Sequence, residues 1–322
     1  LYAGGSFAAA GGVTVNHIAR WDGSSWHPLG TGVSGTFPGY ETCVNALAVS
    51  GNALYAGGNF TSAGGMSANH IARWNGSNWS ALGSGMDAAY AYAPQVQALA
   101  VIGTDLYAGG RFNRAGGQTV NYIAKWNGSA WTGLATGTGE READWVWALA
   151  AIGSDLYVGG EFTAPSGVPA VHIARWNGSS WSALGSGMGT TALFYPHSVI
   201  ALAVRATDLY VGGNFTTVGG VSANHIAKWD GSSWSALGSG IGGGADAYVG
   251  TLAVGGGNLY AGGEFASAGG VPVNNIARWD GSAWSALGSG IGGAYPWVRT
   301  LAVSDTALYA GGDFASAGGV PA

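Results

Sequence analysis

The sequence predicts an all-β fold built from repeated units of four short antiparallel strands. Three observations support this prediction: one phrase recurs about every 50 residues, the apolar runs are too short for helices, and turn residues separate the runs. Glycine accounts for 61 of the 322 residues and interrupts the runs throughout the chain. Hydrophobic residues make up 47% of the chain, which is enough for a large core and argues against disorder.

The recurring phrase is Leu-Tyr-(Ala/Val)-Gly-Gly-x-Phe, and Ile-Ala-(Arg/Lys)-Trp follows it. The first phrase begins at Leu1, Leu54, Leu106, Leu156, Leu209, Leu259 and Leu308. The second begins at Ile18, Ile71, Ile123, Ile173, Ile226 and Ile276. An Asp-Gly or Asn-Gly pair and a second Trp come next, and an aliphatic run then leads into the following repeat.

Each repeat therefore contains four predicted strands, for example 44–49, 54–60, 71–74 and 79–83, which we call the first to fourth strands of a repeat. The Asp-Gly or Asn-Gly pair supplies the positive φ of a tight hairpin between the third and fourth strands. Four antiparallel strands with this period are typical of the blade of a β-propeller rather than of a solenoid coil.

The motifs of the repeat resemble those of the kelch repeat, which forms the blades of galactose-oxidase-type propellers. The resemblance rests on the Gly-Gly pair of the second strand, the aromatic residues of the third strand and the Trp that opens the fourth. It covers the whole chain and implies a kelch-like propeller. It leaves the function open, because kelch propellers include oxidases, adaptors and adhesive surface modules. Phrases such as Asn-His-Ile-Ala-Arg-Trp also resemble repeats of secreted or surface-attached bacterial proteins, which implies an extracellular or cell-surface location.

We expect a single propeller domain over 1–322, with six repeats of about 50 residues and a partial seventh at 308–322. Six blades close if the first strand at 298–303 pairs with the strands of 1–29, and seven blades are the alternative. The chain begins at Leu1 rather than at a Met, so we expect it to be a fragment of a longer protein.

Aromatic residues outside the repeat template gather in the inter-repeat loops, which join the fourth strand of one repeat to the first strand of the next. These loops cover 31–43, 84–95, 136–145, 186–198, 239–248 and 289–297. The off-template aromatic residues lie in the loops or just beyond them, and they are Phe37, Tyr40, Tyr90, Tyr92, Trp145, Trp147, Phe194, Tyr195, Tyr248, Tyr295 and Trp297. Two interpretations stay open: a binding face of exposed rings, or local packing between repeats.

The inter-repeat loops are acidic as well as aromatic. Their acidic residues are Glu41, Asp87, Glu140, Glu142, Asp144 and Asp246. This mixture suits sugars, on which rings stack and whose hydroxyls bond to carboxylates, or a basic protein. The candidate ligand-binding residues are Phe37, Tyr40, Tyr90, Tyr92, Trp145, Phe194, Tyr195, Tyr248, Tyr295, Trp297, Asp87, Glu140, Glu142, Asp144 and Asp246.

Other charges belong to the repeat itself. The third strand carries one basic residue in every repeat: Arg20, Arg73, Lys125, Arg175, Lys228 or Arg278. We expect Glu161 and Glu264 of the second strand to pair across the sheet with Arg175 and Arg278. Arg111 of the second strand, next to Lys125, does not fit this scheme.

No metal or cofactor is expected. His17, His70, His172 and His225 share one slot of the template, so they lie too far apart to ligate one ion, and we assign them a structural role. Cys43 is the single cysteine and is expected to be a small buried residue. The copper chemistry of galactose oxidase is not carried over, because the residues that hold the metal there cannot be assembled from this sequence.

Composition limits the partners. The net charge of −5 argues against nucleic acid, and no apolar run is long enough to insert in a membrane. We expect a non-enzymatic extracellular recognition or adhesion module that binds glycan or protein and that can self-associate. The alternatives are a structural spacer or assembly subunit of a large surface protein and, less favoured, a propeller-based glycan hydrolase or lyase that uses Glu140, Glu142 and Asp144.

Overall fold

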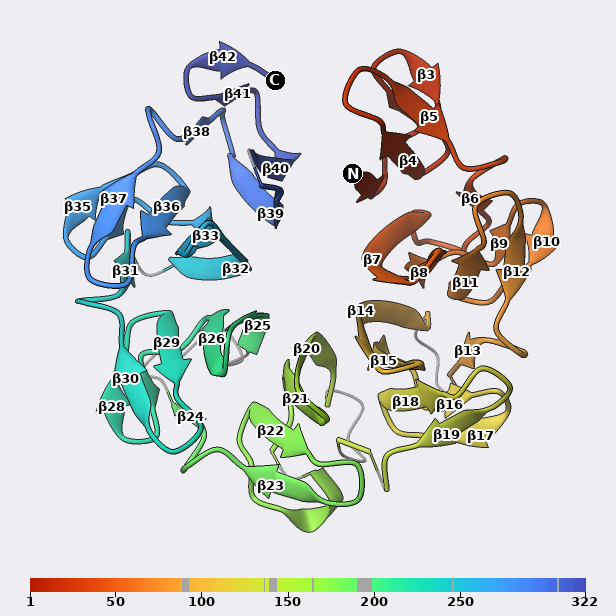
Figure 1. Cartoon of the computed structure of the whole chain (residues 1–322), viewed down its shortest axis with the longest axis horizontal. Coiled ribbons are helices and arrows are strands. Elements are labelled where there is room, and N and C mark those ends of the chain that lie inside the picture. The colour runs from red at the N-terminus through yellow and green to blue at the C-terminus, as the bar shows by residue number, and fades with distance from the viewer. Residues whose placement is uncertain are drawn as a thin grey trace. The chain divides into compact units, whose positions relative to one another are not determined.

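The computed structural model describes residues 1–88, 93–135, 137–138, 144–163, 165–189, 199–244, 246–305 and 307–322. Within these residues, nearly every regular element is a β-strand in a small antiparallel sheet of two to four strands (Figure 1). The exception is one turn of 3-10 helix, η1 (Pro165–Gly167). The predicted fold class, an all-β propeller-like fold, is confirmed.

The chain forms two compact units. The first comprises Leu1–Leu156, Ala164–Gly167 and Trp176–Trp181, and the second comprises Tyr157–Thr163, Val168–Arg175 and Ser182–Ala322. In the repeats whose four main strands are all described, the strands pair in the predicted order, first to second to third to fourth.

The first unit contains three main sheets. They are β1 (Tyr2–Gly4), β4 (Ile18–Trp21) and β5 (Trp26–Pro28); β7 (Cys43–Ser50), β8 (Ala53–Asn59), β11 (Ile71–Trp74) and β12 (Trp79–Ala81); and β14 (Gln95–Ile102), β15 (Asp105–Arg111), β18 (Ile123–Trp126) and β19 (Trp131–Gly133). A further sheet comprises β20 (Val146–Ile152), β21 (Asp155–Gly160), β22 (Ile173–Trp176) and β23 (Trp181–Ala183).

The second unit contains the main sheets of the later repeats. They are β25 (Val199–Arg205), β26 (Asp208–Gly213), β29 (Ile226–Trp229) and β30 (Trp234–Ala236); β32 (Tyr248–Gly255), β33 (Asn258–Glu264), β36 (Ile276–Trp279) and β37 (Trp284–Ala286); and the pair β39 (Trp297–Val303) and β40 (Leu308–Asp313). β39 pairs with β40, the strand that follows it along the chain.

Small hairpins that the sequence pattern did not predict lie between the second and third strands. Each consists of two-residue strands, and most pair with a strand in the preceding inter-repeat loop. The sets are β2 (Ala9–Ala10) with β3 (Val13–Thr14); β6 (Val33–Ser34), β9 (Ser62–Ala63) and β10 (Met66–Ser67); β13 (Met86–Asp87), β16 (Arg114–Ala115) and β17 (Gln118–Thr119); β24 (Met188–Gly189), β27 (Thr217–Val218) and β28 (Val221–Ser222); β31 (Ile241–Gly242), β34 (Ser267–Ala268) and β35 (Val271–Pro272); and β38 (Ile291–Gly292), β41 (Ser316–Ala317) and β42 (Val320–Pro321).

The Gly-Gly pair is required because neither position has room for a side chain. A Cβ on Gly109, the first glycine of its pair, would overlap the side chain of Val146 at the start of the next first strand. A Cβ on Gly110 would overlap the backbone carbonyl of Gln95 in the paired strand. The same two clashes recur at Gly57 and Gly58. Glycine here sets the close approach of neighbouring sheets and is unrelated to any phosphate-binding loop.

The Trp pairs hold successive repeats together. In the pair Trp229 and Trp234 the ring centroids are 5.1 Å apart, and the second ring is buried. The Nε1–H of Trp234 donates to the backbone carbonyl of Leu184 in the preceding repeat at 3.0 Å. Equivalent bonds join Trp79 to Leu29 at 2.7 Å and Trp131 to Leu82 at 2.8 Å. The second Trp therefore packs and bonds across a repeat boundary.

Candidate functional site

The first strand of a repeat carries a β-bulge near its start. In β7, β14, β25, β32 and β39 the register with the second strand shifts by one residue just after a buried Val. The residue that occupies the bulge differs in each strand, and these residues are Asn45, Gln97, Ile200, Gly250 and Arg299. Because a bulge re-aims a side chain, the fold presents one variable residue at this end of each of these strands.

In the second unit, an ion pair and an aromatic ring meet at the bulge of β39. The guanidinium of Arg299 lies over the ring of Trp297, 5.1 Å from its centroid. Arg299 also donates to Asp313 Oδ2 through Nε and Nη2, each at 2.6 Å. Both charged side chains are exposed, at 59% and 61%. Asp313 ends β40 directly opposite Trp297, so backbone register places all three side chains together.

Tyr248 completes this group from the neighbouring strand β32, which packs beside β39. It lies opposite Glu264 in β33. Burial raises the pKa of Tyr248, the charge of Glu264 raises it further, and the charge of nearby Arg299 opposes the rise. The phenol thus stays protonated and can donate a hydrogen bond. We call Tyr248, Glu264, Trp297, Arg299 and Asp313 the Arg299 cluster.

A second group has the same design in the first unit. The guanidinium of Arg111 lies 4.7 Å from the ring centroid of Trp145, which packs edge-on against Trp147 at 5.5 Å. Gln95 lies opposite Arg111 across the sheet, and Gln97 Nε2 donates to Gln95 Oε1 at 2.8 Å. We call Arg111, Trp145, Trp147, Gln95 and Gln97 the Arg111 cluster. It accounts for Arg111, which the charge scheme left unexplained.

The indole N–H of Trp147 is an unsatisfied hydrogen-bond donor in this cluster. Its Nε1–H is buried and has no acceptor among the described residues. A buried N–H without a partner is costly, so this donor is available to an acceptor from a ligand or from the adjacent loop.

The remaining predicted aromatic residues in the described part of the chain also reach the surface. Tyr295 is 81% exposed, and Phe37 is 44% exposed beside a half-buried Tyr40, with ring centroids 6.4 Å apart. Asp87 and Asp246 are exposed as expected. Asp144 departs from the expectation of an accessible carboxylate, because it is only 7% exposed. Six predicted site residues lie outside the described residues: Tyr90, Tyr92, Glu140, Glu142, Phe194 and Tyr195.

The predicted pairing of Glu264 with Arg278 is wrong. Arg278 lies opposite Tyr260, four residues away from Glu264 along β33, and its Nε donates to Ser285 Oγ at 3.2 Å. Two other third-strand cations pair with the Asp that opens the second strand, Lys125 with Asp105 at 3.1 Å and Lys228 with Asp208 at 3.2 Å. The pairing of Glu161 with Arg175 stays a prediction.

The histidine slot has a backbone explanation. His17, His70, His172 and His225 all have positive φ, as do Tyr122 and Asn275 in the same slot. Asn and His are enriched in this region, which explains why they alternate there. Burial lowers the pKa of His70 to about 4. In the described part of the chain no group of three or more His, Cys, Asp or Glu residues is placed to hold a metal ion.

Cys43 is half-buried, and its Sγ–H donates to Asn45 Oδ1 at 3.1 Å. Burial raises the pKa of the thiol, which keeps it protonated and opposes a nucleophilic role. Cys43 is therefore less buried than the sequence predicts.

The sequence prediction, which took aromatic and acidic residues of the inter-repeat loops as the candidate site, missed most polar members of both clusters. Arg111, Glu264 and Asp313 follow the Gly-Gly pair, and Gln97 and Arg299 occupy the bulge. A signal for them was present: the slot after Gly-Gly and the third residue of the first strand are among the most variable positions of the repeat. Only the register of the structure shows that the slot after Gly-Gly lies opposite the residue two positions before the bulge.

Comparisons with known proteins support the fold alone. No family model and no curated protein matches the sequence. The structure resembles the computationally designed Ika8 protein, with a TM-score of 0.50 and 16% identity over 85% of this chain and 69% of that one.

Two structures of the extracellular domain of BT4673 from B. thetaiotaomicron are also similar. One is described as a hybrid two component system and the other as a one component system, with TM-scores of 0.53 and 0.52 and 12% identity. Each match covers 92% of this chain, which spans only 34% of the length of those chains. Among the described residues, no helix has the length and apolar character needed to cross a membrane.

Proposed function

We propose that this chain is a non-enzymatic recognition module that binds a glycan or a protein at the bulged ends of the first strands and the adjoining inter-repeat loops. The observation that carries the proposal is the Arg299 cluster, where an indole, an exposed ion pair and a phenol donor meet on variable slots of an otherwise uniform repeat. Variable side chains gathered at the start of the first strands and in the adjoining loops are what a recognition surface requires.

The chemistry of the cluster favours a glycan. Trp297 and Tyr295 offer ring faces on which the C–H face of a sugar can stack. Asp313 and Arg299 form an exposed ion pair whose remaining lone pairs and N–H groups can bond to hydroxyls. The Arg111 cluster offers the same combination of indole, guanidinium and amide.

We further propose that the module is kelch-like and works outside the cell. The kelch assignment rests on the Gly-Gly pair and the paired Trp residues of the repeat. The location is supported by the resemblance in fold to a domain described as extracellular. The spacer alternative predicts that a neighbouring domain covers the same rings. The hydrolase alternative loses support from Asp144, one of its three carboxylates, because that residue is buried.

A glycan array followed by titration calorimetry tests the proposal. We expect a bound glycan whose affinity falls about tenfold or more in Trp297→Ala, because aromatic anchors dominate binding energy. Arg299→Ala should weaken binding as well. Arg73→Ala, which removes an exposed third-strand arginine instead, is the matched control and should bind normally. Retention of full affinity in both Trp297→Ala and Arg299→Ala would exclude this site.

A further inference from the structure

We infer that the first compact unit holds a second ligand site, for an uncharged saccharide, in a pocket beside the Trp pair of β18 and β19. The residues that line the pocket include none of those at the bulged strand ends, so the inference goes beyond the proposed function. It has a volume of about 650 Å³, within the range of sites for small molecules.

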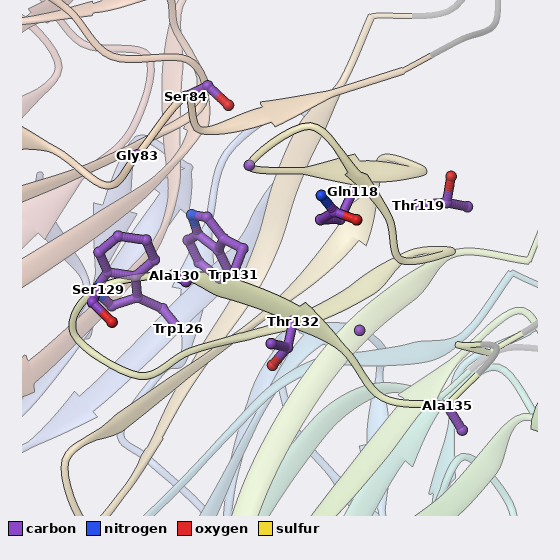
Figure 2. Close-up of a pocket in the computed structure, with 12 residues that line it drawn as sticks. Gly83, Ser84, Gln118, Thr119, Trp126, Ser129, Ala130, Trp131, Thr132 and Ala135 are labelled. Carbon is purple, nitrogen blue, oxygen red and sulfur yellow. The ribbon is translucent and has the colours of Figure 1, made fainter.

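Three segments of chain form the walls of this pocket. They are the turn at 83–84, the small hairpin of β16 and β17, and the stretch 126–135, which runs from the end of β18 through the turn and β19. Figure 2 shows the indoles of Trp126 and Trp131 at one end of the group, with Gln118 and Thr132 farther along on two different segments.

The walls depart from the repeat template at several slots. Gln118 occupies the slot that holds Val13, Met66, Val168, Val221 or Val271 in other repeats. Gly133 stands where Ala81, Ala183, Ala236 and Ala286 occur and where the first repeat has Pro28, and Ala135 stands where Gly30, Gly83, Gly185, Gly238 and Gly288 occur. Ala135 has a φ of 52°, a conformation that glycine adopts more easily. Departures that converge on one pocket of a repeat protein point to a local function there.

Gly133 has no backbone reason to be glycine. A Cβ at this position would come no closer than 3.4 Å to any atom, which is ordinary contact, and its φ is not positive. The backbone therefore tolerates alanine here, and a methyl group at this lining position would rest against the backbone of Thr119, Val120 and Ala135 and take up room beside the pocket.

The side chains that line the pocket favour an uncharged ligand. No lining residue carries a charge, which disfavours ionic ligands. Trp126 is half-buried and tilted 49° to Trp131, so part of its ring faces the pocket. The N–H of Trp131 is already donated to Leu82, so this indole contributes only apolar surface. Apolar ring surface beside small polar groups fits the C–H face and the hydroxyls of a sugar.

The hydroxyl oxygens of Ser129 and Thr132 can accept hydrogen bonds from a ligand. The hydroxyl of Ser129 donates to Asn127 Oδ1 at 2.9 Å, and that of Thr132 donates to the Lys125 carbonyl at 3.4 Å. Their lone pairs stay available, and the exposed amide of Gln118 can both donate and accept. A ligand rich in hydroxyl groups satisfies all three.

The test uses the full chain and a panel of neutral mono- and disaccharides, followed by saturation-transfer NMR and tryptophan fluorescence. We expect at least one sugar to bind and its affinity to fall about tenfold in Gly133→Ala and in Gln118→Val, because both variants restore residues of the repeat template and narrow or depolarise the pocket. Both variants should keep the melting temperature of the parent protein, since the other repeats fold with these residues.

Two controls separate this site from the Arg299 cluster and from general effects. Met66→Val changes the same slot in the preceding repeat and should leave affinity unchanged. Trp297→Ala should also leave it unchanged, so failure of the proposed function and failure of this inference are distinguishable. The inference is overturned if no neutral sugar binds at high millimolar concentration, or if binding survives both Gly133→Ala and Gln118→Val.

Discussion

At the scale of single residues, backbone conformation explains positions that chemistry alone would misassign. A slot that holds histidine in four repeats suggests metal binding or catalysis. Its positive φ in all six repeats and its place just before the third strand show that it ends a loop and leads into that strand. The Asp or Asn of the hairpin turn between the third and fourth strands also has a backbone role. For example, Asn75 Oδ1 accepts hydrogen bonds from the backbone N–H groups of Ser77 and Asn78 at 2.9 and 2.8 Å. Turn chemistry therefore accounts for that residue.

The buried histidine makes folding stability depend on pH. Burial lowers the pKa of His70 from 6.5 to about 4, so the unfolded chain binds more protons than the folded one between these values. Stability should therefore be complete above pH 6.5 and should fall as the pH drops toward 4, by up to about 3 kcal/mol from this residue.

Urea denaturation across this pH range, compared with His70→Asn, measures the effect. Asparagine occupies the same slot at Asn275 with positive φ, so the variant should fold. It should lose stability less steeply as the pH falls. Parallel curves for the two proteins would show that His70 is not responsible, since His17 and His225 also have lowered pKa values and would then carry the effect.

At the scale of strands, the sequence predicts the main elements well and their partners less well. The four apolar runs and the Asn-Gly turns were sufficient to predict strand order. The small hairpins were missed because their strands are only two residues long, and the Ala-Gly-Gly segment between them looks like a loop. The Glu264–Arg278 pairing failed because register, which the pattern does not reveal, places Tyr260 opposite Arg278.

The sequence also does not predict the β-bulge of the first strand. Its residue has no preferred chemistry, as Ile200, Gly250 and Arg299 show, so no motif marks it. The candidate site was therefore located only approximately, through the exposed aromatic residues that flank it. The charged and amide members of the Arg299 and Arg111 clusters became apparent when the strand pairing was known.

Each fourth strand is joined to the preceding repeat by its Trp, and this predicts a large loss of stability when the ring is removed. Trp234→Ala should lower the free energy of unfolding by about 3–5 kcal/mol, because it empties a buried site. Trp234→Phe should cost less, about 1–3 kcal/mol, because much of the ring is retained while the Leu184 carbonyl loses its donor.

Chemical denaturation of these variants beside Ser235→Ala, a change at the exposed neighbouring position, measures the difference. Ligand affinity of the folded fraction should be unaffected in all three. If Trp234→Ala unfolds at the same denaturant concentration as the parent protein, the assignment of these rings to packing between repeats is incorrect.

At the scale of the whole molecule, the surface combines few charges with exposed apolar side chains. Charged residues make up only 8% of the chain, so electrostatic repulsion between molecules is weak. One slot at the small hairpins is repeatedly apolar and exposed: Val13 at 38%, Met66 at 50%, Val271 at 37% and Val320 at 67%. Gln118 occupies the same slot and shows that a polar residue is compatible with the fold there.

This surface predicts weak, concentration-dependent self-association. Sedimentation velocity over a wide range of protein concentration should show a rising average mass, and added salt should change it little because the contacts are apolar. The double variant Met66→Gln and Val271→Gln should associate less and keep its melting temperature, since each change copies the residue found at Gln118. A mass that stays constant at every concentration would contradict the prediction. Association that is undiminished in the double variant would assign the contact to another exposed group, of which Tyr295 at 81% is the most prominent.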